Sequence, residues 1–148
     1  MATIYFSGSI SGGREDVPVY QQMVRALSEA GHRVIAGAVA SETTGSGGES
    51  LGAGDIFARD LAWIDEAARE GGVLVAEVSR PSTGVGYEIA YARYRHGLRV
   101  ICLYRPAYTT RCTAMVSGDP GIELIEYVDG ETDQAIERLK QILERPSE

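Results

Sequence analysis

Short apolar segments that alternate with helical patterns are the feature that most constrains how this sequence can fold. The run Val73-Leu74-Val75-Ala76 is apolar at every position, as expected for a strand that is buried on both faces. Similar segments predict further strands at residues 3–7, 33–39, 99–104 and 122–128. Apolar residues at helical spacing predict helices that begin near residues 17, 55 and 86, and a closing helix at 132–144. The alternation predicts a single doubly wound α/β domain over residues 1–148, with a parallel sheet covered on both faces.

The charge balance is acidic, with 14 Lys and Arg against 21 Asp and Glu and a net charge of −7. Because no basic stripe is visible, we expect no binding to a nucleic-acid polymer, although a few backbone N–H groups can still hold a small anion. No apolar run approaches the roughly 18 residues that cross a membrane, and no basic segment followed by an apolar one marks a signal peptide. We therefore expect no membrane association and a cytoplasmic location.

The cysteines and histidines do not form a metal site in the sequence. Cys102 and Cys112 are too few for a disulfide framework, and His32 and His96 lie far from both. No pair among them has the spacing of metal ligands. We expect neither a metal nor a cofactor.

The stretch 77–88 is the best candidate for a binding loop. It follows the apolar run at 73–76 and leads into a helical pattern, so it lies at the carboxyl edge of the sheet, where ligands collect in α/β folds. It carries Ser82, Gly84 and Gly86, and the loop after the first strand carries Gly8 and Ser9. A helix start with such loops suits a phosphate, but glycines there also serve simply to make tight turns. Both interpretations stay open at this point.

Three familiar motifs can be excluded. Gly84 and Gly86 could open a dinucleotide fingerprint, but the third glycine position is Ile89 and the next strand ends without an acidic residue. The segment 8–12 resembles a nucleophile elbow, yet its central residue is Ile10. A P-loop is absent as well.

Two carboxylates and a tyrosine could carry chemistry. Glu88 is predicted in the first turn of its helix, where the helix dipole favours the ionised form, although an ordinary acidic residue is also common there. Asp60 falls on a mainly apolar helix face, where a carboxylate is unusual unless it has a specific role. One nucleophile or base and one proton donor are what cleavage of a glycosidic bond requires. Tyr5 could donate a hydrogen bond to one of them or serve as a core aromatic.

These residues belong to short motifs that run through nearly the whole chain. In their order and content the motifs resemble the 2'-deoxynucleoside 5'-monophosphate N-hydrolases, a family of the nucleoside 2-deoxyribosyltransferase superfamily. They are Tyr5-Phe6-Ser7-Gly8-Ser9-Ile10, Gly12-Gly13-Arg14-Glu15-Asp16, Asp60-Leu61 with Trp63, Val75-Ala76-Glu77-Val78, Pro81-Ser82, Gly84-Val85-Gly86-Tyr87-Glu88, Cys102-Leu103 with Arg105-Pro106, and Ala114-Met115.

The resemblance implies a five-stranded flavodoxin-like sheet and a homodimer with its sites near the interface. It implies that Glu88 is the nucleophile that forms a glycosyl-enzyme intermediate, that Asp60 assists protonation of the departing base, and that Tyr5 orients Glu88. The implied substrate contacts come from the loop after the first strand, from the phosphate loop, and from a hydroxyl of the neighbouring subunit. These residues are Gly8, Ser9 and Ile10, then Ser82, Gly84 and Gly86, and finally Thr113.

The chain departs from the family pattern at several positions. Ser11 stands where better-known members carry an arginine, Ala38 where they carry a histidine, and Thr113 where they carry a serine. Extra length at 69–72 could shift Asp60. Residues 41–54, rich in Gly, Ser and Thr, are long enough to form a lid.

The resemblance implies hydrolysis of a deoxynucleoside 5'-monophosphate to free base and 2-deoxyribose 5-phosphate. Two alternatives stay open: a nucleoside 2-deoxyribosyltransferase, which uses the same intermediate, and a nucleotide-binding module without turnover.

Overall fold

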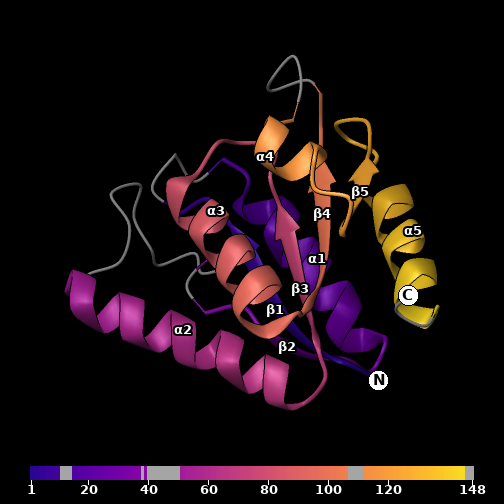
Figure 1. Ribbon diagram of the computed structural model, residues 1–148. Helices are drawn as coiled ribbons and strands as arrows, with labels where there is room; N and C mark the ends of the chain where they lie inside the picture. Colours follow the sequence, from indigo (N-terminus) through magenta and orange to yellow (C-terminus); the bar gives the residue numbers. More distant parts are fainter. Residues whose placement is uncertain (11–14, 38, 40–50, 107–111, 146–148) are drawn as a thin grey trace.

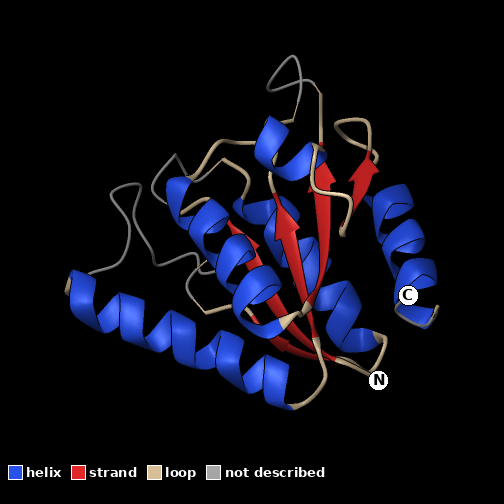
Figure 2. Ribbon diagram, in the orientation of Figure 1, coloured by secondary structure: helices blue, strands red, loops and turns tan. Residues whose placement is uncertain are grey.

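A five-stranded sheet, parallel throughout, forms the centre of the computed structural model, which describes residues 1–10, 15–37, 39, 51–106 and 112–145 (Figures 1 and 2). The strand order is β2-β1-β3-β4-β5, the order of flavodoxin-like folds, so the predicted α/β class is confirmed. The strands are β1 (Thr3–Gly8), β2 (Arg33–Ile35), β3 (Val73–Glu77), β4 (Arg99–Tyr104) and β5 (Ile122–Glu126). The helices are α1 (Val17–Glu29), α2 (Ala53–Arg69), α3 (Thr83–Ala90), α4 (Ala114–Ser117) and α5 (Thr132–Glu144), and a π-helical turn, η1 (Tyr91–Arg95), continues α3.

The sheet has a separate apolar layer on each face because strand side chains alternate. Ile4 and Phe6 of β1 pack with α1 and α5, whereas Tyr5 packs with α2, α3 and η1. Figure 1 shows α2 and α3 in front of the sheet and α1 behind it. The same alternation places Ser7 on the face of Tyr5, toward α3.

Several predicted boundaries were wrong. The second strand was expected to reach residue 39 but ends at Ile35, because Gly37 has φ +53° and turns the chain under the Trp63 ring. The last strand ends at Glu126, two residues earlier than expected.

Two helices begin earlier than predicted. The second was expected to start at Asp55, but the carbonyl of Gly52 accepts the Asp55 and Ile56 N–H groups, so the helix begins at Ala53. The third was expected near Gly86 but begins at Thr83, because the Ser82 hydroxyl caps it by accepting the Val85 N–H at 3.3 Å.

Some predictions fall outside the described residues. Ser11 and Ala38 are among them, as is most of the candidate lid, of which only residues 51–54 are described. Within the described part of the chain, every helix is too short or too polar to cross a membrane.

Candidate active site

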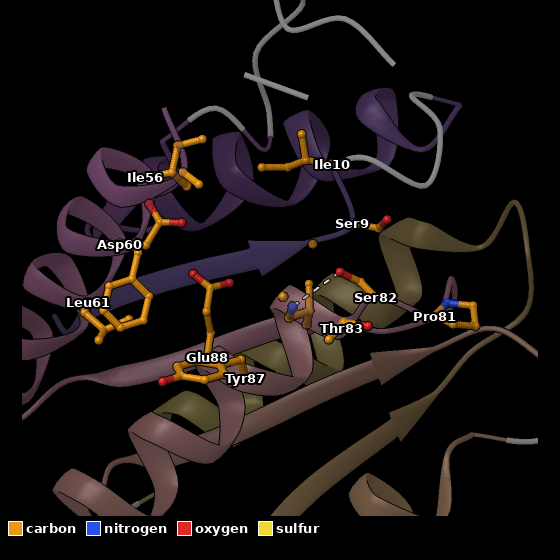
Figure 3. A pocket seen from close by; sticks show the side chains of 15 residues that line it. Ser9, Ile10, Ile56, Asp60, Leu61, Pro81, Ser82, Thr83, Tyr87 and Glu88 are labelled. Carbon is orange, nitrogen blue, oxygen red and sulfur yellow. Dashed lines mark hydrogen bonds between the residues drawn. The ribbon is translucent and has the colours of Figure 1, made fainter. Parts of the chain in front are cut away.

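A cleft of ≈ 720 Å³ opens between α2 and α3 at the carboxyl edge of the sheet (Figure 3). Its walls come from the β1–α1 loop, from one side of α2, and from the turn that joins β3 to α3. Most of the residues predicted to form the site line it. They are Gly8, Ser9, Ile10, Asp60, Ser82, Gly84 and Glu88.

Two hydroxyl groups of β1 bind the Glu88 carboxylate. The Tyr5 hydroxyl donates a short hydrogen bond to Oε2, and the Ser7 hydroxyl donates to Oε1 at 2.8 Å. Both donors lie on the same face of the strand because they are two residues apart. The predicted contact between Tyr5 and Glu88 is therefore present in the structure.

The pKa of Glu88 is raised to about 7, from an ordinary value of 4.5, by burial first and also by the nearby Asp60 carboxylate. The hydrogen bonds from Tyr5 and Ser7 oppose this by lowering the pKa. The expectation that the helix dipole would favour the ionised form was wrong, because Glu88 is the sixth residue of α3 and lies beyond its first turn. Burial and the charge of Glu88 raise the pKa of Tyr5, so its phenol stays a donor.

Asp60 faces Glu88 across the cleft, and Figure 3 shows the two carboxylates turned toward one another. Arg59 donates to Asp60 Oδ1 from Nε at 3.0 Å and from Nη2 at 2.9 Å. The Arg59 guanidinium lies over the Trp63 ring at 4.6 Å from its centre, a cation–π contact that fixes the arginine. Arg59 thus holds the Asp60 carboxylate through its Oδ1 atom.

Residues 69–72, where extra length was expected, do not displace Asp60 from the cleft. The helix ends in a turn in which Gly71 has φ +65° and the Gly72 N–H donates to the Ala67 carbonyl at 2.8 Å. This turn begins well after Asp60 in the chain.

The glycines after β3 are not required by the turn itself. Neither Gly84 nor Gly86 has a positive φ. A Cβ on Gly84 would meet nothing nearer than the Ser82 hydroxyl at 3.9 Å, and one on Gly86 nothing within 4 Å. The space beside these glycines is open, which favours close approach of a ligand over a tight turn as the reason for them.

Gly8 is required for a different reason. A Cβ there would lie 2.9 Å from the Tyr20 ring and 3.1 Å from the Val39 side chain. The close packing of the end of β1 against Tyr20 of α1 and against Val39 therefore excludes a side chain at this position.

Gly86 and Thr113 do not line the cleft that holds Glu88. They lie in a second cleft of ≈ 930 Å³, on the other side of the Ser82 turn, between η1 and α4. Ser82 lines both clefts. Within one chain, the structure separates Thr113 from the carboxylate pair.

A buried ionic cluster ties together the loops at this edge of the sheet. The Arg105 side chain, 1 % exposed, lies 2.9 Å from Asp16 and 3.2 Å from Glu77 and donates to the Ser79 hydroxyl at 3.0 Å. Arg80 donates to Asp16 at 2.7 Å. Asp16 is the N-cap residue of α1 but makes no side-chain cap there, because its carboxylate serves this cluster.

Two parts of this arrangement were missed in the sequence. Ser7 was given no role of its own within the motif at residues 5–10, although its spacing of two residues from Tyr5 places both hydroxyls on one strand face. Arg105 lies just after a strand, and its three acidic partners, Asp16, Glu77 and Asp129, come from distant segments. No local pattern marks such a cluster.

The fold and the cleft together define a class of protein. A flavodoxin-like sheet carries two carboxylates that face one another at its carboxyl edge, one of them with a pKa near neutrality. Such a pair can supply a nucleophile and a proton donor for cleavage of a glycosidic bond. Among the described residues, no group of three or more His, Cys, Asp or Glu side chains is placed to hold a metal ion.

Comparison with known proteins identifies the family. The chain is 37% identical to the human 5-hydroxymethyl-dUMP N-hydrolase over 140 residues, which cover 91% of this chain and 77% of that protein. It is 38% identical to the protein of the same name from Tetraodon nigroviridis, with 90% and 94% covered. A relative from Syntrophotalea carbinolica, 42% identical with 84% and 83% covered, has the provisional name 2'-deoxynucleoside 5'-phosphate N-hydrolase 1. No family model matches the chain. The chain belongs to the 2'-deoxynucleoside 5'-monophosphate N-hydrolase family.

Proposed function

We propose that this protein hydrolyses the N-glycosidic bond of 2'-deoxynucleoside 5'-monophosphates, releasing the free base and 2-deoxyribose 5-phosphate. The observation that carries the proposal is the Glu88 carboxylate, bound by Tyr5 and Ser7 and facing Asp60 across an open cleft. The names of the relatives, which place the reaction on deoxynucleoside monophosphates, support the substrate class.

The chemistry proceeds in two steps. In the first, an ionised Glu88 oxygen attacks the anomeric carbon, the bond from that carbon to the base breaks, and the departing base takes from Asp60 the one proton that the two facing carboxylates share. In the second, Asp60 accepts a proton from water, the resulting hydroxide adds to the anomeric carbon, and the bond to Glu88 breaks. The Glu88 carboxylate is thereby regenerated, and Asp60 again holds the proton.

The start of α3 offers a place for the 5'-phosphate. The Ser82 hydroxyl caps the helix, and the backbone around Gly84 is open to the cleft. Free N–H groups in the first turn of a helix, together with the helix dipole, favour an anion. This turn and Glu88 are on the same short helix, so a bound phosphate and the attacking carboxylate keep a fixed separation.

The second cleft supports association of two copies. Tyr94 and Met115 in its wall are 73 % and 84 % exposed, and large apolar side chains exposed together mark interaction surfaces. The sequence resemblance implies that Thr113 reaches the phosphate of the neighbouring subunit, and a homodimer formed through this face would meet that requirement. Light scattering after gel filtration should give the mass of a dimer, and Met115→Glu should give a monomer. A monomeric wild-type protein at all concentrations would contradict this part of the proposal.

The reaction can be tested with a panel of substrates. Purified protein is incubated with the four common 2'-deoxynucleoside 5'-monophosphates, 5-hydroxymethyl-dUMP, the matching ribonucleotides and the deoxynucleosides. Chromatography should detect free base from at least one deoxynucleoside monophosphate. If none releases base, the hydrolase proposal fails. If an added second base yields a new nucleoside, the protein is a transferase.

A further inference from the structure

Ser7 has a buried hydroxyl whose contact with Glu88 suggests a specific role. The residue is 2 % exposed and lies near the end of β1, paired in register with Ala76 of β3. Its hydroxyl donates to Glu88 Oε1 at 2.8 Å. A buried hydroxyl without a partner is costly, and here the partner is the carboxylate that performs the proposed reaction.

We propose that Ser7 is a positioning residue for Glu88, whose hydroxyl fixes the plane of the carboxylate and stabilises its ionised form for attack on the sugar. This inference deepens the proposed function and rests on it in one respect, namely that Glu88 attacks the sugar. The geometric part, that Ser7 controls the orientation and protonation of Glu88, can be tested without a substrate.

The two donors on β1 have separate effects on Glu88. Tyr5 holds Oε2, and its ring is packed in the apolar layer between the sheet and α3, so that bond is fixed in place. A carboxylate held at one oxygen alone can still swing about that bond. Ser7 holds the other oxygen, and two donors from one rigid strand define the carboxylate plane.

Ser7 also counters the groups that disfavour a charge on Glu88. The ionisable groups that face Glu88 in the described part of the chain are Tyr5 from β1 and Asp60 from α2, with Arg59 across a small adjoining cavity. Asp60 is acidic and disfavours a second negative charge, as does burial. Since Tyr5 and Ser7 donate hydrogen bonds that favour the carboxylate, removal of Ser7 shifts the balance toward protonated Glu88.

The direct test is a carbon NMR titration of protein labelled at the glutamate carboxyl carbons, with Glu88→Gln used to assign the Glu88 signal. The wild-type midpoint is expected near 7, and Ser7→Ala should raise it by about 1 pH unit, the size expected for loss of one hydrogen bond to a charged group. Ser7→Thr, which keeps a hydroxyl, should restore a midpoint close to the wild-type value.

Thr3→Val is the matched control. Thr3 lies on the same strand and the same face, is buried, and donates its hydroxyl to Glu70 at 3.1 Å, away from the cleft. This variant should leave the Glu88 midpoint unchanged. An unchanged midpoint in Ser7→Ala, or an equal shift in Thr3→Val, would overturn the inference.

Turnover provides a second measurement. In Ser7→Ala the acidic limb of the profile of kcat/KM against pH should move up together with the NMR midpoint, giving roughly tenfold lower kcat/KM at pH 6 and a smaller loss at pH 9. An equal loss at every pH would mean that Ser7 only supports the fold and would overturn the inference. Absence of base release by the wild-type protein would count against the proposed function, while the NMR titration would still decide the role of Ser7.

Discussion

Tyr5 and Glu88 are 83 residues apart in the chain, yet the phenol of the first strand donates directly to the carboxylate of the third helix. The contact exists because β1 and β3 are hydrogen-bonded neighbours and α3 follows β3 on the face to which Tyr5 points. A carboxylate buried on that face retains a proton up to neutral pH.

The raised pKa of Glu88 predicts how stability depends on pH. Its folded-state pKa, about 7, lies above the ordinary value of 4.5, so the folded state binds the proton more tightly than the unfolded state does. The stability that this tighter proton binding contributes is complete below pH 4.5 and is lost as the pH rises through 7. We expect Glu88→Gln, which cannot ionise, to gain stability relative to wild type over this interval, by roughly 1–3 kcal/mol. Urea unfolding at pH 4.5 and pH 8 measures the difference, and a gap that does not widen toward pH 8 would count against the raised pKa.

The open space beside Gly84 predicts a loss of binding without a loss of stability. Gly84→Ala should leave the free energy of unfolding equal or raise it by up to about 1 kcal/mol, because alanine favours a helix over glycine. The added methyl group lies in the cleft, so KM for the monophosphate should rise by roughly tenfold. Gly54→Ala is the control, because Gly54 also lies near the start of a helix with nothing within 4 Å of an added Cβ. A lower stability in Gly84→Ala with unchanged KM would show that the glycine serves the turn.

The buried cluster around Arg105 predicts a large structural penalty. Arg105→Met removes the positive charge beside Asp16 and Glu77, and leaving buried carboxylates without their partner costs about 3–5 kcal/mol. Arg33→Met is the comparison, because Arg33 is half exposed and its pairs with Glu66 and Glu70 lie at the surface, where such pairs contribute less than about 1 kcal/mol. Denaturant unfolding of both variants distinguishes the two environments. Equal losses in the two would be inconsistent with a cluster that is both buried and ionic.

The class of fold could be predicted from the sequence because parallel strands that are buried on both faces appear in it as continuous apolar runs. The bounds of β4 and α5 agree with the prediction, since both elements are continuous and are delimited by polar or turn residues. The start of α3 was misplaced because the cap at Ser82 is formed by a side chain rather than by apolar spacing. That error carried over to Glu88, whose charge state is set by burial and not by the helix dipole.

Part of the site could also be predicted from the sequence. Asp60 stood out because a carboxylate on an apolar face is unusual, whereas Tyr5 was marked by the family resemblance; the structure brings both to Glu88. Ser7 was missed because a serine next to a glycine-rich loop is common, and its role depends on the helix packed above it. Arg105 was missed because its partners are distant in sequence.

Glu88 is the proposed nucleophile, and a comparison of base release by the wild-type protein and Glu88→Gln tests its attack on the sugar directly. Both are incubated with a deoxynucleoside monophosphate that the wild type cleaves, at pH 8, where the wild-type carboxylate is ionised. Glutamine keeps the shape of the side chain but cannot serve as the nucleophile. We expect base release to fall by roughly 10³-fold or more, with a circular dichroism spectrum equal to that of wild type. Base release by folded Glu88→Gln at a rate near that of wild type would rule out Glu88 as the nucleophile.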